Sequence, residues 1–362
     1  MRRQIAKITE ALSYARMGAA DGGPPVFTQF AEMVRLRSGP FRIKPREYYE
    51  QRLYRPEISA EAKSAFVGSE EEAKDFVYRI GNHNWNGIAE DKLMTYQFLD
   101  GFGLRYPKVV GIGHAYRTCP GAPTLASAEA LADWLREACP FPVFAKPSDA
   151  SLGAGCELIE SIDRAADTLH RADGSKIPIG EYVRKKWPRT AGPLIFQEVL
   201  RPHVEIARVI GERAATLRIM VLLLPEGPHV HRIAFRIPVG RNMTDNYRSG
   251  KSGNMLGRVD AETGDVVGVY SGIGANRRAV DRHPDTETPF AGWRLPFWPE
   301  TLDAVRSAAT GLRGIPIQGW DVAITPDGPS FVEVNHRGDF DLLQQAEGRG
   351  VADETFLSLL NT

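Results

Sequence analysis

The sequence predicts an α+β fold in which a helical N-terminal region precedes two mixed subdomains. Apolar residues recur at helical spacing through roughly the first 80 residues. From Phe141 onward the apolar pattern changes to short, strand-like runs. At 362 residues the chain is also too long for one ordinary hydrophobic core, so we expect more than one subdomain.

The first part of the chain is expected to be helical, with one strand. The expected helices are Phe27–Leu36, Glu70–Ile80, about Ala89 to Leu99 and Ser127–Cys139, and the expected strand is Tyr106–Ile112. Gly22-Gly23-Pro24-Pro25 breaks the pattern before the first of these helices, and Gly101 ends the third. This region has no strand followed by GxGxxG, so a dinucleotide-binding domain is not supported.

The second part is expected to consist mainly of strands. They are Pro142–Lys146, Cys156–Glu160, Leu194–Leu200, and two hairpins, Thr216–Leu224 with Val230–Val239 and Gly319–Thr325 with Ser330–Asn335. Asp281–Glu300 contains four prolines and is expected to be a long irregular connection, and a helix should follow the last hairpin. We place the helical region at 1–104, the first subdomain at 105–200 and the second at 201–362.

Composition narrows the class of protein. Lysine plus arginine equals aspartate plus glutamate at 45 each, which argues against a general nucleic-acid partner. The longest aliphatic run, Ile219 to Leu224, is far below the roughly 20 residues that span a bilayer. The three isolated cysteines contain no CxxC pair, which fits a reducing compartment. We therefore expect a cytoplasmic enzyme with no membrane span.

A stretch of small residues from Ser148 to Gly155 joins two of the expected strands. Glycines let backbone N–H groups approach a phosphate closely, and Lys146 at the end of the preceding strand supplies a positive charge. A plain glycine turn in a hairpin explains the same stretch.

The last hairpin carries a group of oxygen ligands. Asp321 lies on one arm, and Glu333 and Asn335 lie on the other. Carboxylate and amide oxygens suit Mg²⁺, which typically shares nucleotide phosphates. A four-residue loop with regular strands would put Glu333 on the opposite face from Asp321. A three- or five-residue loop, or one bulge, would put all three side chains on one face. A solvated hairpin face is the other interpretation.

Gln197-Glu198-Val199-Leu200 and the later Glu205 form a third candidate. The end of a strand can offer its backbone to an adenine edge, and a carboxylate further along can accept ribose hydroxyls. An edge strand with surface acids is the alternative.

Taken in order along the chain, these features resemble the ATP-grasp superfamily, and most closely the sugar-transfer-associated ATP-grasp family. The runs that carry the resemblance, over roughly residues 80 to 350, are Trp85-Asn86-Gly87, Asp91-Lys92-Leu93, Thr216-Leu217-Arg218-Ile219, Asp245-Asn246, Asp260-Ala261-Glu262-Thr263-Gly264, His283-Pro284-Asp285-Thr286 and Gly319-Trp320-Asp321-Val322-Ala323-Ile324-Thr325 through Asp327-Gly328-Pro329.

The resemblance implies an ATP-grasp fold whose two α+β subdomains clamp ATP, with Mg²⁺ as the metal. It implies nucleotide contacts from Lys92, Lys146, Ser151, Gly153, Gly155, Gln197, Glu198, Leu200 and Glu205. It implies metal ligation by Asp321, Glu333 and Asn335. Arg218 and Arg236 match basic positions that face the triphosphate and the acyl-phosphate, so they are the expected catalytic residues.

The reaction implied by the resemblance joins a small-molecule carboxylate to an amine through an acyl-phosphate, with release of ADP and phosphate. A phosphotransferase on the same fold and a non-catalytic ATP-binding protein are the alternatives. The family name adds an association with saccharide or natural-product biosynthesis. Three features depart from the family pattern. Gly319 stands where many members have an arginine, the loop at Gly250-Lys251-Ser252-Gly253 differs, and the N-terminal region is helical.

Overall fold

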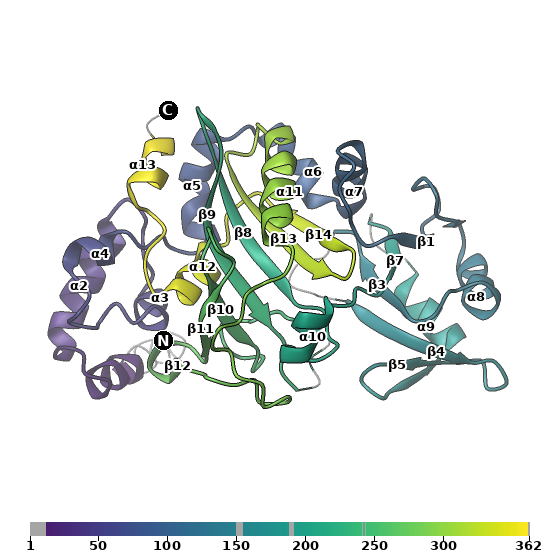
Figure 1. Cartoon of the computed structure of the whole chain (residues 1–362), viewed down its shortest axis with the longest axis horizontal. Helices are drawn as coiled ribbons and strands as arrows, with labels where there is room; N and C mark the ends of the chain where they lie inside the picture. Colours follow the sequence, from purple (N-terminus) through teal and green to yellow (C-terminus); the bar gives the residue numbers. More distant parts are fainter. Residues whose placement is uncertain (1–11, 150–154, 188–191, 241, 243, 361–362) are drawn as a thin grey trace, which may run out of the picture.

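From Val109 onward the chain is organised around two β-sheets that lie side by side, with the helical N-terminal region at the far end of the second sheet (Figure 1). The computed structural model describes residues 12–149, 155–187, 192–240, 242 and 244–360. Within these ranges each sheet has seven strands. Most neighbouring strands are antiparallel, and the helices pack against the sheets, so the expected α+β class is confirmed.

The first sheet has the order β2-β1-β7-β3-β4-β5-β6. Its strands are β1 (Val109–Gly113), β2 (Thr124–Leu125), β3 (Val143–Pro147), β4 (Glu157–Asp163), β5 (Thr168–Arg171), β6 (Lys176–Pro178) and β7 (Leu194–Glu198). Helices α8 (Ala128–Glu137) and α9 (Ile179–Lys186) accompany it. Leu131, Leu135, Tyr182 and Val183 from these helices pack with Val143 and Phe196 in one apolar cluster.

The second sheet has the order β12-β11-β10-β9-β8-β13-β14. Its strands are β8 (Thr216–Leu224), β9 (Gly227–Ile237), β10 (Met255–Val259), β11 (Val266–Ser271), β12 (Arg278–Ala279), β13 (Ile317–Thr325) and β14 (Gly328–Asn335). Helix α10 (Val204–Ile210) connects the two sheets, and α11 (Trp298–Gly311) lies on the second. Leu217, Ile219 and Trp320 point to the α11 side and pack there with Val305 and Ala308.

The opposite face of the second sheet is divided into two halves. In one half, Met220, Leu222 and Ile317 are fully buried beneath aromatic residues such as Phe76 and Phe340. In the other half, the same strands carry Arg218 and Asp321, which form a direct cross-strand pair. The helices cover only the apolar half, so the charged half is left for the candidate site.

The last N-terminal helix and the two C-terminal helices make that cover, while the earlier N-terminal helices pack in a cluster of their own. The N-terminal helices are one over residues 12–20, then α2 (Val26–Ser38), α3 (Pro45–Glu50), α4 (Ala60–Ser64) and α5 (Glu70–Ile80), and the C-terminal helices are α12 (Phe340–Glu347) and α13 (Glu354–Leu360). Phe41 and Phe76 make edge contacts with Phe356, so the two ends of the chain share one core. The helical N-terminal region is therefore confirmed as part of the folded body.

Two expectations about individual elements are wrong. The single helix from about Ala89 to Leu99 is two helices, α6 (Asn86–Glu90) and α7 (Lys92–Gly101). Asp91 separates them because its carboxylate accepts hydrogen bonds from Leu93 N and Met94 N and so caps α7. The irregular connection stops at Trp298, where α11 begins with Pro299 in its first turn.

The other expected elements are present; α5 and β8 have the expected bounds, and the rest have shifted ends. The strand expected from Tyr106 begins only at Val109, and the strand expected to reach Leu200 ends at Glu198. The first sheet lies within residues 109–198 and the second within 216–335, while the division of the chain at 104 and 200 remains a prediction. No helix in the described part of the chain is long and apolar enough to cross a membrane.

Candidate active site

A cavity of about 680 Å³ lies between the two sheets. Phe144, Lys146 and Leu158 line it from the first sheet. Arg236 and Asp321 line it from the second. Its volume is typical of a small-molecule site. Apolar side chains such as Phe144 and Leu158 and charged side chains such as Lys146 and Asp321 both line it, as a ligand with an apolar ring and a charged tail would require.

The structure shows how the two strands of the last hairpin pair, which the sequence alone did not decide. Thr325 pairs with Gly328 across a two-residue turn, and Val322 pairs with Phe331. Asp321 nevertheless pairs with Glu333, so Val332 is an extra residue in β14 and forms a bulge. Because of this bulge, Asp321 and Glu333 lie directly opposite each other on one face of the hairpin. Asn335 follows Glu333 by two residues on the same face.

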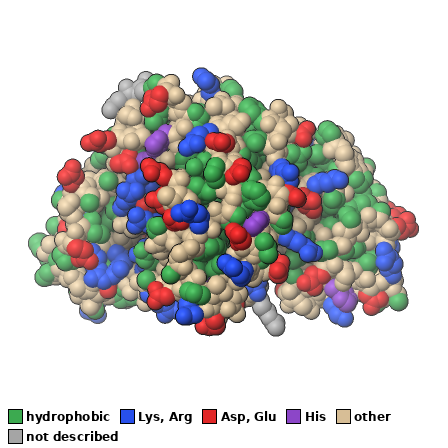
Figure 2. Space-filling view, viewed as in Figure 1, with side chains coloured by type: hydrophobic (Ala, Val, Ile, Leu, Met, Phe, Trp, Pro, Cys, Tyr) green, Lys and Arg blue, Asp and Glu red, His purple; other side chains and the backbone are tan. Residues whose placement is uncertain are grey.

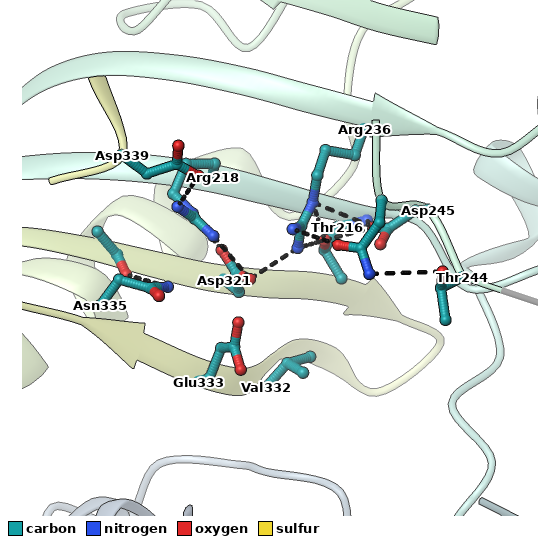
Figure 3. A network of polar contacts seen from close by, with 12 residues as sticks. Thr216, Arg218, Arg236, Thr244, Asp245, Asp321, Val332, Glu333, Asn335 and Asp339 are labelled. Atoms are coloured by element: carbon teal, nitrogen blue, oxygen red, sulfur yellow. Dashed lines mark hydrogen bonds and ion pairs between the residues drawn. The ribbon is translucent and has the colours of Figure 1, made fainter. Parts of the chain in front are cut away.

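Two arginines hold the Asp321 carboxylate between them (Figure 3). Arg218 donates to both of its oxygens, with Nη2 at 3.2 Å from Oδ2. Arg236 Nη2 lies 2.7 Å from the same Oδ2. Burial opposes ionisation of Asp321, but the two guanidinium groups outweigh it, so the pKa of this carboxyl is held far below its usual value. Asp321 is therefore an anion wherever the protein is folded near neutral pH.

The polar network continues beyond both arginines. Arg218 Nη1 lies 2.6 Å from Oδ2 of Asp339, the residue before α12. Arg236 Nε donates to Thr216 Oγ1 at 2.9 Å and lies 3.4 Å from Asp245 Oδ2. Figure 3 shows these side chains as a row in which acidic and basic groups alternate. Burial raises the pKa of Asp245, because the arginine beside it only partly offsets the loss of solvent.

The two expected phosphate-binding lysines both lie at the cavity. Lys92 Nζ is 3.5 Å from Glu333 Oε2 and donates to the Ser148 carbonyl at 3.4 Å. Lys146 Nζ donates to Tyr96 Oη at 2.9 Å. Burial opposes its charge, but Tyr96 and Glu333 outweigh burial, so the pKa of Lys146 is raised. Both lysines are almost fully buried and remain close to carboxylate or hydroxyl oxygens.

The end of β7 forms another part of the cavity wall, through Gln197, Glu198 and Leu200. The side chains of the first two are engaged with the neighbouring segment. Gln197 Nε2 donates to Pro107 O at 2.8 Å, and Glu198 Oε1 accepts from Lys108 N at 2.9 Å. Lys108 O also accepts from Glu198 N. The backbone groups of the residues after Glu198 are therefore the ones available to hydrogen-bond the edge of a ligand here.

The residue types present fit a magnesium ion. Asp321 and Glu333 supply carboxylate oxygens, and Asn335 donates through Nδ2 to Gly319 O at 3.4 Å, which directs its amide nitrogen away from a metal role. The described part of the chain contains no cluster of three or more histidine, cysteine, aspartate or glutamate residues suited to a metal. The candidate set therefore consists of two carboxylates and one amide, and phosphate oxygens and water would complete the coordination.

Some expected site residues lie elsewhere. Ser151 and Gly153 fall outside the described residues. Gly155 is exposed, and its carbonyl accepts from Lys186 Nζ at 3.1 Å. Glu205 is exposed in the first turn of α10 and does not line the cavity. Arg218 is buried behind Asp321, and neither it nor Asn335 is part of the cavity lining.

The structure adds cavity residues that the sequence did not single out. They include Glu212 and Arg213, which follow α10, and Asn242, Thr244 and Asn246 from the loop after β9. Glu212 occupies the place in the lining that was expected of Glu205. Glu212 could have been predicted from its position in the sequence, since it lies four residues before Thr216, where β8 begins.

Comparison with known families identifies the family of the chain. The family model described as sugar-transfer associated ATP-grasp matches residues 71–357. The chain belongs to this family, and the expected recognition and fold are confirmed. No curated protein sequence matches the chain.

The chain also has limited similarity to several solved structures. An L-amino acid ligase from Bacillus licheniformis is 16% identical with a TM-score of 0.39, over 76% of this chain and 48% of that one. The VanG D-Ala:D-Ser ligase from Enterococcus faecalis is 12% identical with a TM-score of 0.41, over 78% and 62%. A biotin carboxylase from Campylobacter jejuni is 12% identical with a TM-score of 0.41, over 80% and 53%. In each case the aligned region covers less than two thirds of the solved protein.

Proposed function

We propose that the protein is an ATP- and Mg²⁺-dependent ligase that joins a carboxylate to an amine and releases ADP and phosphate. The observation that carries this proposal is the set of charged residues around the cavity, where Lys92, Lys146 and Arg236 converge with Asp321 and Glu333. Three buried cations beside two carboxylates suit a polyphosphate held together with a divalent cation.

The apolar part of the cavity accounts for the other end of the nucleotide. Phe144 and Leu158 offer surfaces for a purine ring, and Val199 and Leu200 offer backbone groups to its edge. Glu212 supplies a carboxylate at the position where ribose hydroxyls would lie. This arrangement orders the adenine, ribose and phosphate sites from the first sheet towards the second.

The chemistry that follows needs no nucleophile from the protein. A carboxylate oxygen of the substrate attacks the γ-phosphorus, the bond to the β-phosphate oxygen breaks, and ADP leaves. The amine then attacks the acyl carbon, the carbon–oxygen bond to phosphate breaks, and the amine proton passes to solvent. Phosphoryl transfer of this kind depends on positioning and on charge stabilisation.

Arg236 is the arginine placed to stabilise the transferring group, since it lines the cavity. Arg218 holds Asp321 from behind and reaches Asp339, so we assign it a positioning role. Asp321, Glu333 and Asn335 would hold Mg²⁺, which when bound neutralises charge on the phosphate oxygens. The carboxylate and amine are small molecules, and the family description associates them with saccharide biosynthesis.

Hydroxylamine tests the reaction without knowledge of the natural amine. It captures acyl-phosphates as hydroxamates, so a panel of amino acids and uronic acids can be screened as the carboxylate with hydroxylamine as acceptor. We expect hydroxamate, ADP and phosphate in equal amounts for one class of carboxylate. ADP with a stable phosphorylated product would indicate a phosphotransferase, and ATP binding without ADP would indicate a binding protein. Either result would overturn the proposal.

Lys146→Ala provides the matched test of the site. The change removes a charge-assisted hydrogen bond to phosphate, on the order of 1.5–3 kcal/mol, so the affinity for a non-hydrolysable ATP analogue should fall roughly 10- to 150-fold. Lys185→Ala, on the outer face of α9, is the control and should bind the analogue like the wild type. Equal affinity in all three proteins, measured by calorimetry, would remove Lys146 from the site.

A further inference from the structure

Helix α2 exposes large apolar side chains at the end of the molecule farthest from the first sheet (Figure 1). Phe27 is 84% exposed, Phe30 60% and Val34 50%. Leu12 and Met17, on the preceding helix, are also exposed. A soluble protein rarely leaves two neighbouring phenylalanines this open without a surface that covers them.

These side chains form one stripe. At about 100° per residue, Phe27, Phe30 and Val34 fall within roughly 60° of the helix circumference. The buried residues of α2, Gln29 and Leu36, lie on the other side of the helix. Among the described residues, the chain covers the inner face of the helix, and the stripe on the outer face faces solvent.

Arginines border the stripe. Arg35 and Arg37 are exposed in the last turn of α2, one on each side of the apolar arc. Arg16, on the preceding helix, is exposed as well.

The two acidic residues described in this region are turned inward. Asp21 accepts from Arg52, Arg55 and Tyr54 at 2.6–2.9 Å. Glu32 is held by Lys63 and Tyr48 in the same way, at 2.6–3.0 Å. The charge that residues 12–38 present to solvent is thus positive.

This surface is separate from the candidate active site. No described residue before Lys92 lines the cavity between the sheets. Figure 2 shows apolar side chains at the same end of the molecule, over α2. A ligand for this surface would therefore not compete with the nucleotide.

We propose that the outer face of α2 docks the protein onto an anionic lipid surface. Phenylalanines inserted at the level of the headgroups and flanking arginines that meet lipid phosphates are the two elements of interfacial helix binding. A second copy of the chain fits less well. A two-fold interface with parallel α2 helices would place Arg35 and Arg37 of both copies together, and an antiparallel one would set them beside the apolar first turn, with the acids of these helices already engaged elsewhere.

The test is co-sedimentation of the full chain with vesicles. Vesicles of phosphatidylcholine alone are compared with vesicles that contain phosphatidylglycerol, at low and at physiological salt. We expect binding only to the anionic vesicles and weaker binding at higher salt. Phe27→Ser/Phe30→Ser should reduce the partition more than about tenfold. Arg35→Gln should reduce it roughly fivefold, as expected for one cation at an anionic surface.

Tyr116→Ser/Val267→Ser is the matched control, because it removes an exposed aromatic and an exposed aliphatic residue elsewhere. It should bind vesicles like the wild type, and circular dichroism should be unchanged in every variant. A wild type that stays in the supernatant, or a double serine variant that still sediments, would overturn the proposal. So would a dimer in light scattering that the same double variant abolishes, since the stripe would then join two copies.

Discussion

The two halves of one face of the second sheet are built by the same strands yet have opposite character. On β8, Met220 and Leu222 are sealed beneath aromatic residues, whereas Arg218, two residues earlier, belongs to a network of charges. On β13, Ile317 lies beneath the aromatic cluster, whereas Asp321 is buried among paired charges and lines the cavity. The strand pattern is the same in both halves, so the difference lies in what covers them. Helices cover the apolar half, and the cavity between the sheets borders the charged half.

The largest expected effect comes from Asp321→Ala. The change leaves two buried arginines without their shared counter-ion, so the free energy of unfolding should fall by about 3–5 kcal/mol, and turnover should be lost. Glu333→Ala should also lose turnover but change stability by less than about 1 kcal/mol, because Glu333 is partly exposed. Urea denaturation and ADP release measure the two effects.

Leu222→Ala is the counterpart in the apolar half. It should destabilise the protein by about 2–5 kcal/mol and leave the affinity of the folded protein for nucleotide unchanged. If Asp321→Ala and Glu333→Ala were equally stable, the charged half would not depend on internal pairing, and the contrast between the halves would be lost.

Arg236→Lys tests the charged half by rate. It keeps the charge but loses the planar fork, so kcat should drop about 10²-fold with ATP affinity nearly unchanged. Arg232→Lys, four residues earlier on the same strand, is the control because Arg232 pairs with Asp353 beside the C-terminal helix. Weaker ATP binding at normal kcat would show that Arg236 contacts the nucleotide only in the ground state.

A second measurement on Arg236 concerns the metal. Since Arg236 and Arg218 occupy the oxygens of Asp321, a cation must compete with them. Arg236→Met should therefore bind Mn²⁺ more tightly than the wild type in the absence of nucleotide, as measured by electron paramagnetic resonance. Weaker binding would mean that the arginine supports the metal site.

The apolar half should show a pH dependence through His231, which approaches Val351 O at 2.8 Å. Burial lowers the pKa of His231 to about 4, below 6.5 for the unfolded chain. Neutral His231 therefore contributes stability that is complete above pH 6.5 and is lost as the pH falls towards 4. Between pH 7 and pH 5 the loss should be about 2 kcal/mol.

The difference between wild type and His231→Gln isolates this effect. Burial raises the pKa of Asp341 well above its usual value, so Asp341 opposes the trend in both proteins. Denaturation midpoints at pH 7 and pH 5 give the comparison. If the difference in denaturation midpoint between the two proteins were the same at pH 7 and pH 5, protonation of His231 would not account for the pH dependence.

The smallest expected effect is on nucleotide affinity, and it distinguishes Glu212 from Glu205 as the residue that contacts the ribose. Glu212→Gln should weaken nucleotide affinity by about 1 kcal/mol, or roughly fivefold, because a hydrogen bond to a ribose hydroxyl is weakened. Glu205→Gln, seven residues earlier and exposed on α10, should bind as the wild type does. The reverse order of affinities would restore the assignment made from sequence.

Sequence reasoning identified the main elements of the site because they depend on local patterns. Lys146 at a strand end and Asp321 with Glu333 on a hairpin are visible as alternation next to turns. The register of that hairpin cannot be predicted in the same way, because nothing in the order of residue types indicates the single bulge at Val332. The sequence points to Glu205 because of its separation from Glu198 along the chain. The structure places Glu205 in the first turn of α10, and no residue of this helix lines the cavity.

The engagement of the arginines also could not be read from the sequence. Alternation predicts that Arg218 and Arg236 leave the apolar core, and both do so. It does not say that Asp321, which is 103 residues from Arg218 and 85 from Arg236, accepts hydrogen bonds from both. Such contacts depend on strand order in the sheet, which single-strand patterns do not encode.

Gly319 has a consequence for how this sequence can vary. A Cβ at this position would lie 3.3 Å from Arg218 Cδ, so the arginine of β8 occupies the space above the glycine of β13. A guanidinium can reach Asp321 from position 218 on β8 or from position 319 on β13, but side chains at these two positions would occupy the same space. A Cβ at 319 needs Arg218 to shift by a few tenths of an ångström, and a whole arginine there would compete with Arg218 for the space beside Asp321. Among relatives, the two positions should change together, and the arginine moves between strands while its charge stays in place.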